Sequence, residues 1–126
     1  MLRTLCLIGL GSCLGGMARY LFSRVVQVAF HTVFPWGTLT VNVLGCLLIG
    51  GLYALLDRGH VGSSDVRLFL TTGFCGGFTT FSTFMYENYS LLQSGKVFLF
   101  MAYSLLSLVV GFGAVCLGIW VTHRLC

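Results

Sequence analysis

Residues 73–84 read GFCGGFTTFSTF, which places a pair of glycines and four hydroxyl-bearing side chains inside an otherwise apolar segment. A helix interrupted here would free backbone groups that hydrocarbon cannot satisfy. Such a break has to be buried in protein, or it has to line a wet or ion-holding site. The stretch therefore predicts a broken membrane helix whose break has a function.

The composition of the whole chain supports a membrane protein. Of its 126 residues, 57% are hydrophobic and only 8% are charged, whereas a soluble domain carries about 25% charged residues. At about 20 residues per helical span, this length accommodates four crossings and no separate soluble domain. We expect a single all-α membrane domain over residues 1–126, with its third helix broken at 75–80 and helices at about 2–26, 36–56, 66–92 and 97–123.

The basic residues only weakly favour one orientation in the membrane. Four crossings would put both termini on one side, together with Arg3, Arg58, Arg67 and Arg124. The other side would carry Arg24 and Lys96, with Arg19 somewhat deeper. So small a bias permits insertion with the termini inward, and it also permits insertion both ways with an antiparallel homodimer.

Polar side chains at membrane depth are costly, which makes them candidate functional residues. Asn42 lies in the middle of the second expected helix, with Thr38 one turn earlier. Its amide can serve a pathway or act only as a hydrogen-bonding clamp between helices. On the fourth helix Tyr103 and Ser107 form a hydroxyl stripe with i, i+4 spacing, and Ser104 lies beside them. This stripe gains meaning only if it faces Asn42, because such hydroxyls often bond to backbone carbonyls.

Two phenylalanines follow the expected break. Phe81 and Phe84 lie on one helical face at i, i+3, with Ser82 and Thr83 between them. They can form a simple packing ridge, or their positive ring edges can hold a small anion. The helix that restarts near Thr80 would point its positive end at the break, and the half-helix before it would offer carbonyl oxygens that suit sodium. One break can thus serve ions of both signs.

Arg19 and Glu87 are the ionisable residues that lie deepest. Arg19 either extends to the membrane surface or serves a site, and Glu87 either lines a vestibule or pairs with a base. The sequence contains no nucleophile with a general base, no phosphate-binding loop and no nucleic-acid-binding patch. We therefore expect neither an enzyme nor a nucleic-acid-binding protein.

These motifs resemble the Fluc/CrcB family of fluoride channels along essentially the whole chain. The matching motifs are GGMARY at 15–20, GTL at 37–39, VN at 41–42 followed by Gly45, and TGFCGGFTTFSTF at 72–84. The resemblance implies a passive fluoride channel that protects a cell from fluoride. It also implies a dual-topology antiparallel homodimer with two pores, a structural sodium ion at the dimer centre, and a bacterial-type plasma membrane.

The resemblance also implies roles for individual residues. Sodium would be held by the backbone carbonyls of Gly76 and Thr79. The family's pore positions map onto Phe81, Phe84, Asn42, Tyr103 and Ser107, with Ser82 and Thr83 beside them, while Arg19, Glu87 and Thr38 take vestibule or structural roles. The chain departs from many relatives in having Met85 and Tyr86 where they have Ser-Ala, which makes the surroundings of Glu87 bulkier.

Two other classes remain as alternatives. A small four-helix multidrug exporter would share the size and the dual topology, but proton-coupled exchange is expected to need a deep carboxylate, which the first helix lacks. A membrane subunit without transport activity would use its small-residue faces for assembly. It would not account for the break, Asn42 and the phenylalanine pair together.

Overall fold

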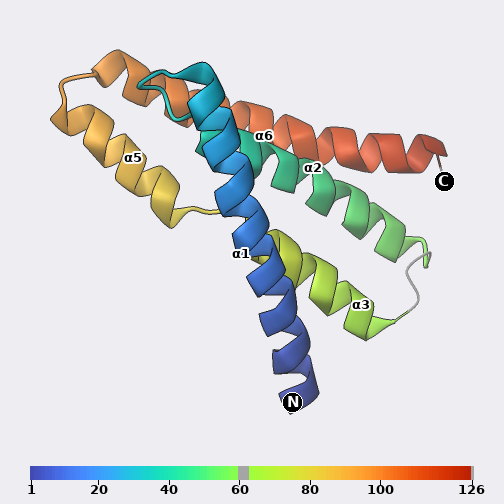
Figure 1. Cartoon of the computed structure of the whole chain (residues 1–126). Coiled ribbons are helices and arrows are strands. Elements are labelled where there is room, and N and C mark those ends of the chain that lie inside the picture. The colour runs from blue at the N-terminus through green and yellow to red at the C-terminus, as the bar shows by residue number, and fades with distance from the viewer. Residues whose placement is uncertain (60–62, 126) are drawn as a thin grey trace.

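The computed structural model describes residues 1–59 and 63–125, and helices make up nearly all of this part (Figure 1). Three helices are long and apolar enough to cross a membrane: α1 (Leu2–Phe30), α2 (Trp36–Asp57) and α6 (Val97–Leu125). The remaining segment consists of α3 (Ser64–Leu68), the π-helical turns η1 (Phe69–Cys75), α4 (Gly76–Phe78) and α5 (Ser82–Gln93). The chain is thus an all-helical integral membrane protein.

The first two helices are joined by a short connection that a side chain of α1 holds in place. α1 ends where His31 takes the left-handed conformation, at φ 46° and ψ 42°, and α2 begins directly after Pro35. The Gln27 side-chain Nε2 donates to the carbonyl oxygens of Thr32 and Phe34. Its Oε1 accepts from the backbone N–H of Gly37 in α2. α1 therefore runs four residues beyond the expected end at 26, because its last turn includes this clamp.

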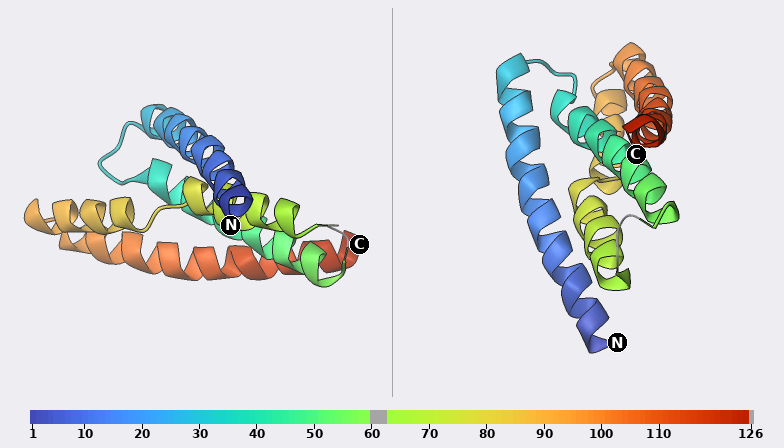
Figure 2. Two further views of the ribbon diagram at one scale, coloured as in Figure 1. Left: turned by 90° about the horizontal axis from the view of Figure 1, so that it is seen from below. Right: turned by 90° about the vertical axis from the view of Figure 1, so that its right-hand side faces the viewer.

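Two of the long helices pack on each other, and the third packs on the broken segment. α2 lies along α6, while α1 crosses α2 at a steep angle and covers η1 and α4 (Figure 2). α5 lies beside the first part of α6, beyond the end of α4. The first part of the broken segment, η1 and α4, consequently lies between α1 and α2, and its last part, α5, lies along α6.

Both ends of the chain lie toward the same end of the molecule. Arg3 forms an ion pair with Asp65, which joins the start of α1 to the start of α3. The Nη2 atom of Arg58 lies 2.6 Å from Nδ1 of His123, which joins the end of α2 to the end of α6. These contacts join helix ends near the two termini, and the expectation that the termini share one membrane side stays a prediction.

Glycines bring α1 and the broken segment into backbone contact. A Cβ atom at Gly11 would lie 2.5 Å from the carbonyl oxygen of Phe69, and one at Gly77 would lie 2.5 Å from that of Ser12. Gly15 similarly abuts the carbonyl of Phe74. Small residues allow membrane helices to approach this closely. Gly11 and Gly15 therefore serve close packing, whereas a Cβ atom at Gly9 or Gly16 would meet nothing within 4 Å.

The interruption itself lies later than the sequence suggested. Gly76 remains helical, at φ −63° and ψ −36°, and the chain becomes extended only at Thr79, at φ −91° and ψ 160°. The break therefore covers residues 79–81 instead of the expected 75–80. The expectation linked the break to its glycines, but Gly77 serves contact with α1, and the break is created by a contact with α2.

Candidate functional site

A cavity of about 400 Å³ lies where the broken segment meets α2 and α6, and we call it the central cavity. Many residues that the sequence singled out line it, although they come from three separate parts of the chain. They are Asn42 from α2, Gly76, Thr79, Phe81 and Phe84 from the broken segment, and Ser107 from α6. The structure thus brings together both predicted sodium ligands and four of the predicted pore residues.

Asn42 replaces the missing helical turn with two hydrogen bonds. Its Nδ2 donates to the carbonyl oxygen of Thr80 over 3.0 Å, and its Oδ1 accepts from the Thr80 N–H over 2.8 Å. The two bonds satisfy backbone groups that a break in hydrocarbon would otherwise leave without partners. Asn42 therefore acts as the clamp that the sequence left as one of its two interpretations, and one Nδ2 hydrogen remains for another acceptor.

The same clamp releases two carbonyl groups. In an unbroken helix the Thr80 N–H would donate to Gly76, and the Thr83 N–H would donate to Thr79. Here the Thr80 N–H donates to Asn42, and the Thr83 N–H donates to Oγ1 of Thr80 over 3.3 Å. The carbonyls of Gly76 and Thr79 are thereby relieved of their helical partners beside the central cavity. Oxygen ligands of this kind suit a hard cation such as sodium.

The two phenylalanines lie close together but in different surroundings. Their ring centroids are 6.1 Å apart with an interplanar angle of 47°. Phe84 is 8% exposed and packs edge-on against Tyr103, whereas Phe81 is 72% exposed. Phe84 is therefore fixed by the core of its own chain, and Phe81 presents its ring outward.

The hydroxyl stripe of α6 divides between two environments. Ser107 is the member that faces the central cavity with Asn42, and its buried Oγ has no hydrogen-bond partner in the described part of the chain. Tyr103 donates its hydroxyl to Oε1 of Glu87 over 2.9 Å, and Ser104 donates to Oδ1 of Asn88 over 3.2 Å. From the sequence alone, this stripe has meaning only if it faces Asn42. Of its three residues, only Ser107 lines the same cavity as Asn42.

A second cavity, of about 530 Å³, lies between α1, α2 and α5, and we call it the vestibule cavity. Thr38 and the half-buried Glu87 line it, as do Arg24 and Gln27. Arg24 brings a positive charge to its wall, while its Nη1 donates to the Tyr20 hydroxyl over 2.8 Å. This cavity thus contains one acidic and one basic side chain.

Arg24 and Gln27 are site residues that the sequence analysis missed. Arg24 entered only as a charge for orientation, and Gln27 was not considered. A usable signal was present, because a polar side chain in the last turns of a membrane helix often satisfies exposed backbone groups in the loop that follows. Nothing local in the sequence, however, indicates that α5 approaches these residues.

Four predicted site residues line neither cavity in the single chain. One of them, Tyr103, reaches the vestibule cavity only through its hydrogen bond to Glu87. Ser82 and Thr83 are exposed on the first turn of α5. Arg19 is half-buried on α1 and is absent from the lining of either cavity. Any contact of these side chains with an ion pathway would require further structure around the chain.

The long apolar helices pack around a segment that breaks beside a mostly apolar cavity with a few polar groups. This arrangement defines the class: a small multi-pass integral membrane protein. The chain belongs to the family described as CrcB-like protein, Camphor Resistance (CrcB), whose sequence model matches residues 6–119. This confirms the family resemblance read from the sequence motifs.

Similar proteins from several bacteria share a single description. The chain is 48% identical over 122 residues to the fluoride-specific ion channel FluC of Phocaeicola vulgatus, covering 97% of this chain and 100% of that protein. It is 44% identical over 118 residues to the protein of that name from Leptospira interrogans serovar copenhageni, covering 94% and 93%. For the protein from Gloeothece citriformis the identity is 41% over 118 residues, covering 94% and 95%.

Proposed function

We propose that this protein is a fluoride-specific ion channel that lowers fluoride inside the cell and so protects against fluoride toxicity. The observation that carries the proposal is the 48% identity that extends over the full length of a relative described as such a channel. The central cavity supplies a physical basis, because it gathers four of the predicted pore residues, Asn42, Phe81, Phe84 and Ser107, into one place.

Passive conduction fits the chemistry of the central cavity. Its lining, as far as the structure describes it, consists of amide, hydroxyl, thiol, backbone and apolar groups, without Asp, Glu, Lys, Arg or His side chains. Neutral donors such as the free Nδ2 hydrogen of Asn42 and the Ser107 hydroxyl can replace water around a small anion without holding it as tightly as a fixed charge would. The edges of Phe81 and Phe84 add weaker positive potential.

The proposal includes an antiparallel homodimer in which segment 64–93 forms the fourth crossing. Phe81 is exposed on a single chain although it lines the central cavity, so a second chain would complete the wall there. Each chain offers the carbonyls of Gly76 and Thr79, and two inverted chains would offer both pairs to one sodium ion at the centre. Since the similar proteins come from bacteria, we place the channel in the bacterial plasma membrane.

Fluoride efflux from proteoliposomes tests this function directly. Liposomes loaded with fluoride and containing the purified protein should release it when the membrane potential is collapsed with an ionophore, and chloride-loaded liposomes should not release chloride. A preparation that stays silent beside an active relative would contradict the channel. Efflux that requires a pH gradient would favour the exporter, and the absence of any transport would favour the assembly subunit.

A further inference from the structure

A third concavity lies between α2 and α6 on a different side of α2 from the central cavity. It is an apolar groove of about 370 Å³, lined by Leu48, Gly51 and Leu55 of α2 and by Leu117 and Val121 of α6, among others. Gly51 follows Ile49 of the central cavity by two positions, which places the two residues on opposite sides of the helix. The groove therefore stays open to lipid in a dimer that joins around the central cavity.

Backbone contact between the two helices creates this groove. A Cβ atom at Gly118 would lie 2.9 Å from the backbone nitrogen of Gly51, so α2 and α6 touch without intervening side chains. The larger residues beside this contact remain partly uncovered, with Leu48 45% and Leu117 51% exposed. The result is a shallow apolar groove along the helix pair that can take an extended hydrocarbon chain.

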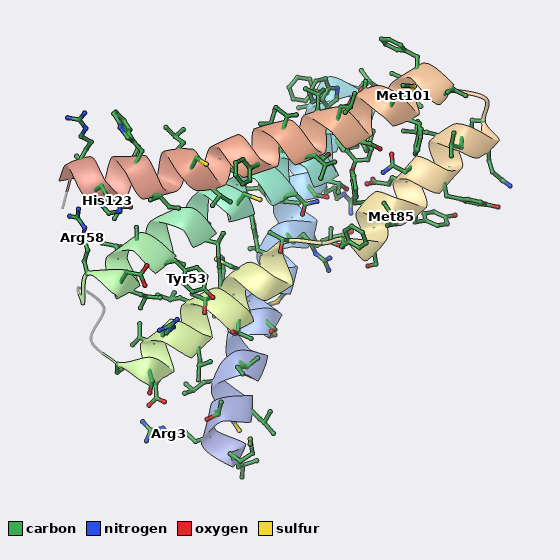
Figure 3. The ribbon with its side chains drawn as sticks, turned by 180° about the vertical axis from the view of Figure 1, so that it is seen from behind. Arg3, Tyr53, Arg58, Met85, Met101 and His123 are labelled. Carbon is green, nitrogen blue, oxygen red and sulfur yellow. The ribbon has the colours of Figure 1, made fainter. Side chains whose placement is uncertain are left out.

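Positive charge lies where the groove reaches the end of the helix pair. Arg58 is the first residue after α2 and follows Leu55 by three positions, and Arg124 follows Val121 by three positions on α6. Arg58 contacts Nδ1 of His123, and the two side chains face each other in Figure 3. Because a guanidinium group only donates, the imidazole nitrogen accepts, and the charge of Arg58 is not neutralised.

The acidic residues at this end of the molecule do not oppose that charge. Asp57 follows Leu55 by two positions and so lies on the opposite side of α2. Asp65 is paired with Arg3 at the start of α3. Arg124 stacks over the ring of Trp120, with its guanidinium carbon 5.2 Å from the ring centroid, and aromatic side chains of this kind favour the membrane interface. The end of the groove is thus basic and lies at headgroup level.

We propose that this groove binds an anionic phospholipid, with an acyl chain along the leucines and the phosphate at Arg58 and Arg124. Guanidinium groups recognise phosphate through paired hydrogen bonds, and Arg58 has donors left after its contact with His123. A zwitterionic lipid brings a cationic headgroup to the same arginines, so the site should prefer a lipid with net negative charge. The site is independent of the ion pathway.

Native mass spectrometry of the detergent-purified protein tests this site. We expect more bound phosphatidylglycerol than phosphatidylcholine when both carry the same acyl chains. Arg58→Gln should weaken phosphatidylglycerol binding about fivefold, as removal of one basic residue beside an anionic lipid predicts, and Arg124→Gln should act in the same direction. Arg67→Gln is the matched control. Arg67 is expected on the same membrane side, but it belongs to α3, none of whose residues lines the groove, and it packs over the Tyr53 ring, 5.7 Å from its centroid.

A second variant tests the apolar part of the site. Leu48→Trp should fill the groove and lower the binding of both lipids, with the melting temperature measured to show that the fold persists. Equal binding of the two lipids by the unaltered protein would overturn the proposal. It would also be overturned if Arg67→Gln weakened phosphatidylglycerol binding as much as Arg58→Gln, or if Leu48→Trp left both lipids bound.

Discussion

At the scale of single residues, Asn42 has two tasks in the proposed channel, and they compete for one amide group. Its oxygen and one of its hydrogens hold the main chain of Thr80, so only the remaining hydrogen can meet an ion. This arrangement explains why a polar residue is retained in the middle of a membrane helix despite its cost. It also means that pathway and break depend on the same side chain.

Replacing Asn42 by aspartate alters both tasks. In Asn42→Asp the Thr80 N–H still finds an acceptor, but the donor to the Thr80 carbonyl is lost and a negative charge enters the central cavity. We expect fluoride efflux from proteoliposomes, followed with a fluoride electrode, to be abolished. Cys46→Ser, a small change in the lining of the same cavity, should retain efflux. Undiminished efflux in Asn42→Asp would remove this residue from the pathway.

The two phenylalanines should respond differently to the same substitution. Phe81→Ile should abolish fluoride efflux and cost less stability than Phe84→Ile, because the Phe81 ring is 72% exposed within its own chain and only the second chain would cover it. Phe84→Ile should also lower the free energy of unfolding by about 1–2 kcal/mol, because its ring packs edge-on against Tyr103. Efflux assays and thermal unfolding in detergent check the pair, and equal losses of stability would contradict the assigned environments.

At the scale of helices, the packing of α1 on η1 and α4 depends on glycines that have no room for a side chain. A Cβ atom at Gly15 would press on the Phe74 carbonyl and lie 3.0 Å from the backbone nitrogen of Phe78. At the next position, Gly16, a Cβ atom would meet nothing within 4 Å. Adjacent positions on one helix therefore offer a matched comparison.

Gly15→Ala should destabilise the protein, and Gly16→Ala should not. The first change forces two backbones apart, for which overpacking predicts a loss of about 1–3 kcal/mol. The second adds a methyl group to open space, and alanine is also the better helix former. Thermal unfolding in detergent compares the two variants. Similar melting temperatures would show that α1 does not approach the broken segment as closely as described.

The break makes a second prediction at this scale, concerning sodium. If the Gly76 and Thr79 carbonyls bind sodium, the melting temperature should rise with sodium concentration and not with a bulky organic cation of equal ionic strength. Thr79→Val should keep this dependence, because it retains both the carbonyl and the methyl group that faces Gly45. A melting temperature that is indifferent to sodium would argue against the site.

Much of the fold follows from local sequence, but the break does not. Hydrophobic composition and span length predicted α1, α2 and α6 to within a few residues. The break lies further along the chain than predicted. Its hydrogen-bond partner Asn42 is 38 positions away from Thr80, so local sequence does not indicate where the break falls. Gly77 showed only that something approaches closely, and not that the neighbour is Ser12 of α1. In the site, contacts between helices decide that Ser107 meets Asn42 while Tyr103 meets Glu87.

At the scale of the whole molecule, the single chain is incomplete on the side of the central cavity. Phe81 faces outward there, and α6 exposes large apolar side chains along much of its length, including Leu105, Leu108 and Phe112. Lipid can cover such a surface, but a pathway for an ion requires a wall on every side. A second copy in the inverted orientation would supply that wall.

Dual topology makes a prediction about the labelling of the two ends of the chain. In a background without native cysteines, Lys96→Cys and Arg3→Cys mark opposite membrane sides. With inverted dimers, a membrane-impermeant thiol reagent added outside intact cells should label about half of each variant. A single orientation would instead label one variant completely and the other not at all, and this outcome would contradict the antiparallel dimer.

The hydrogen bonds between Asn42 and Thr80 end on main-chain atoms of Thr80, and this affects how the contact is encoded. The side chain at position 80 is free of position 42, and is constrained only by its own bond to the Thr83 N–H. Substitutions at these two positions therefore have no reason to accompany each other. Related sequences should therefore show no correlated substitutions at positions 42 and 80, although the contact stabilises the break in the third segment. Only the residue type at position 42 would be restricted by this contact.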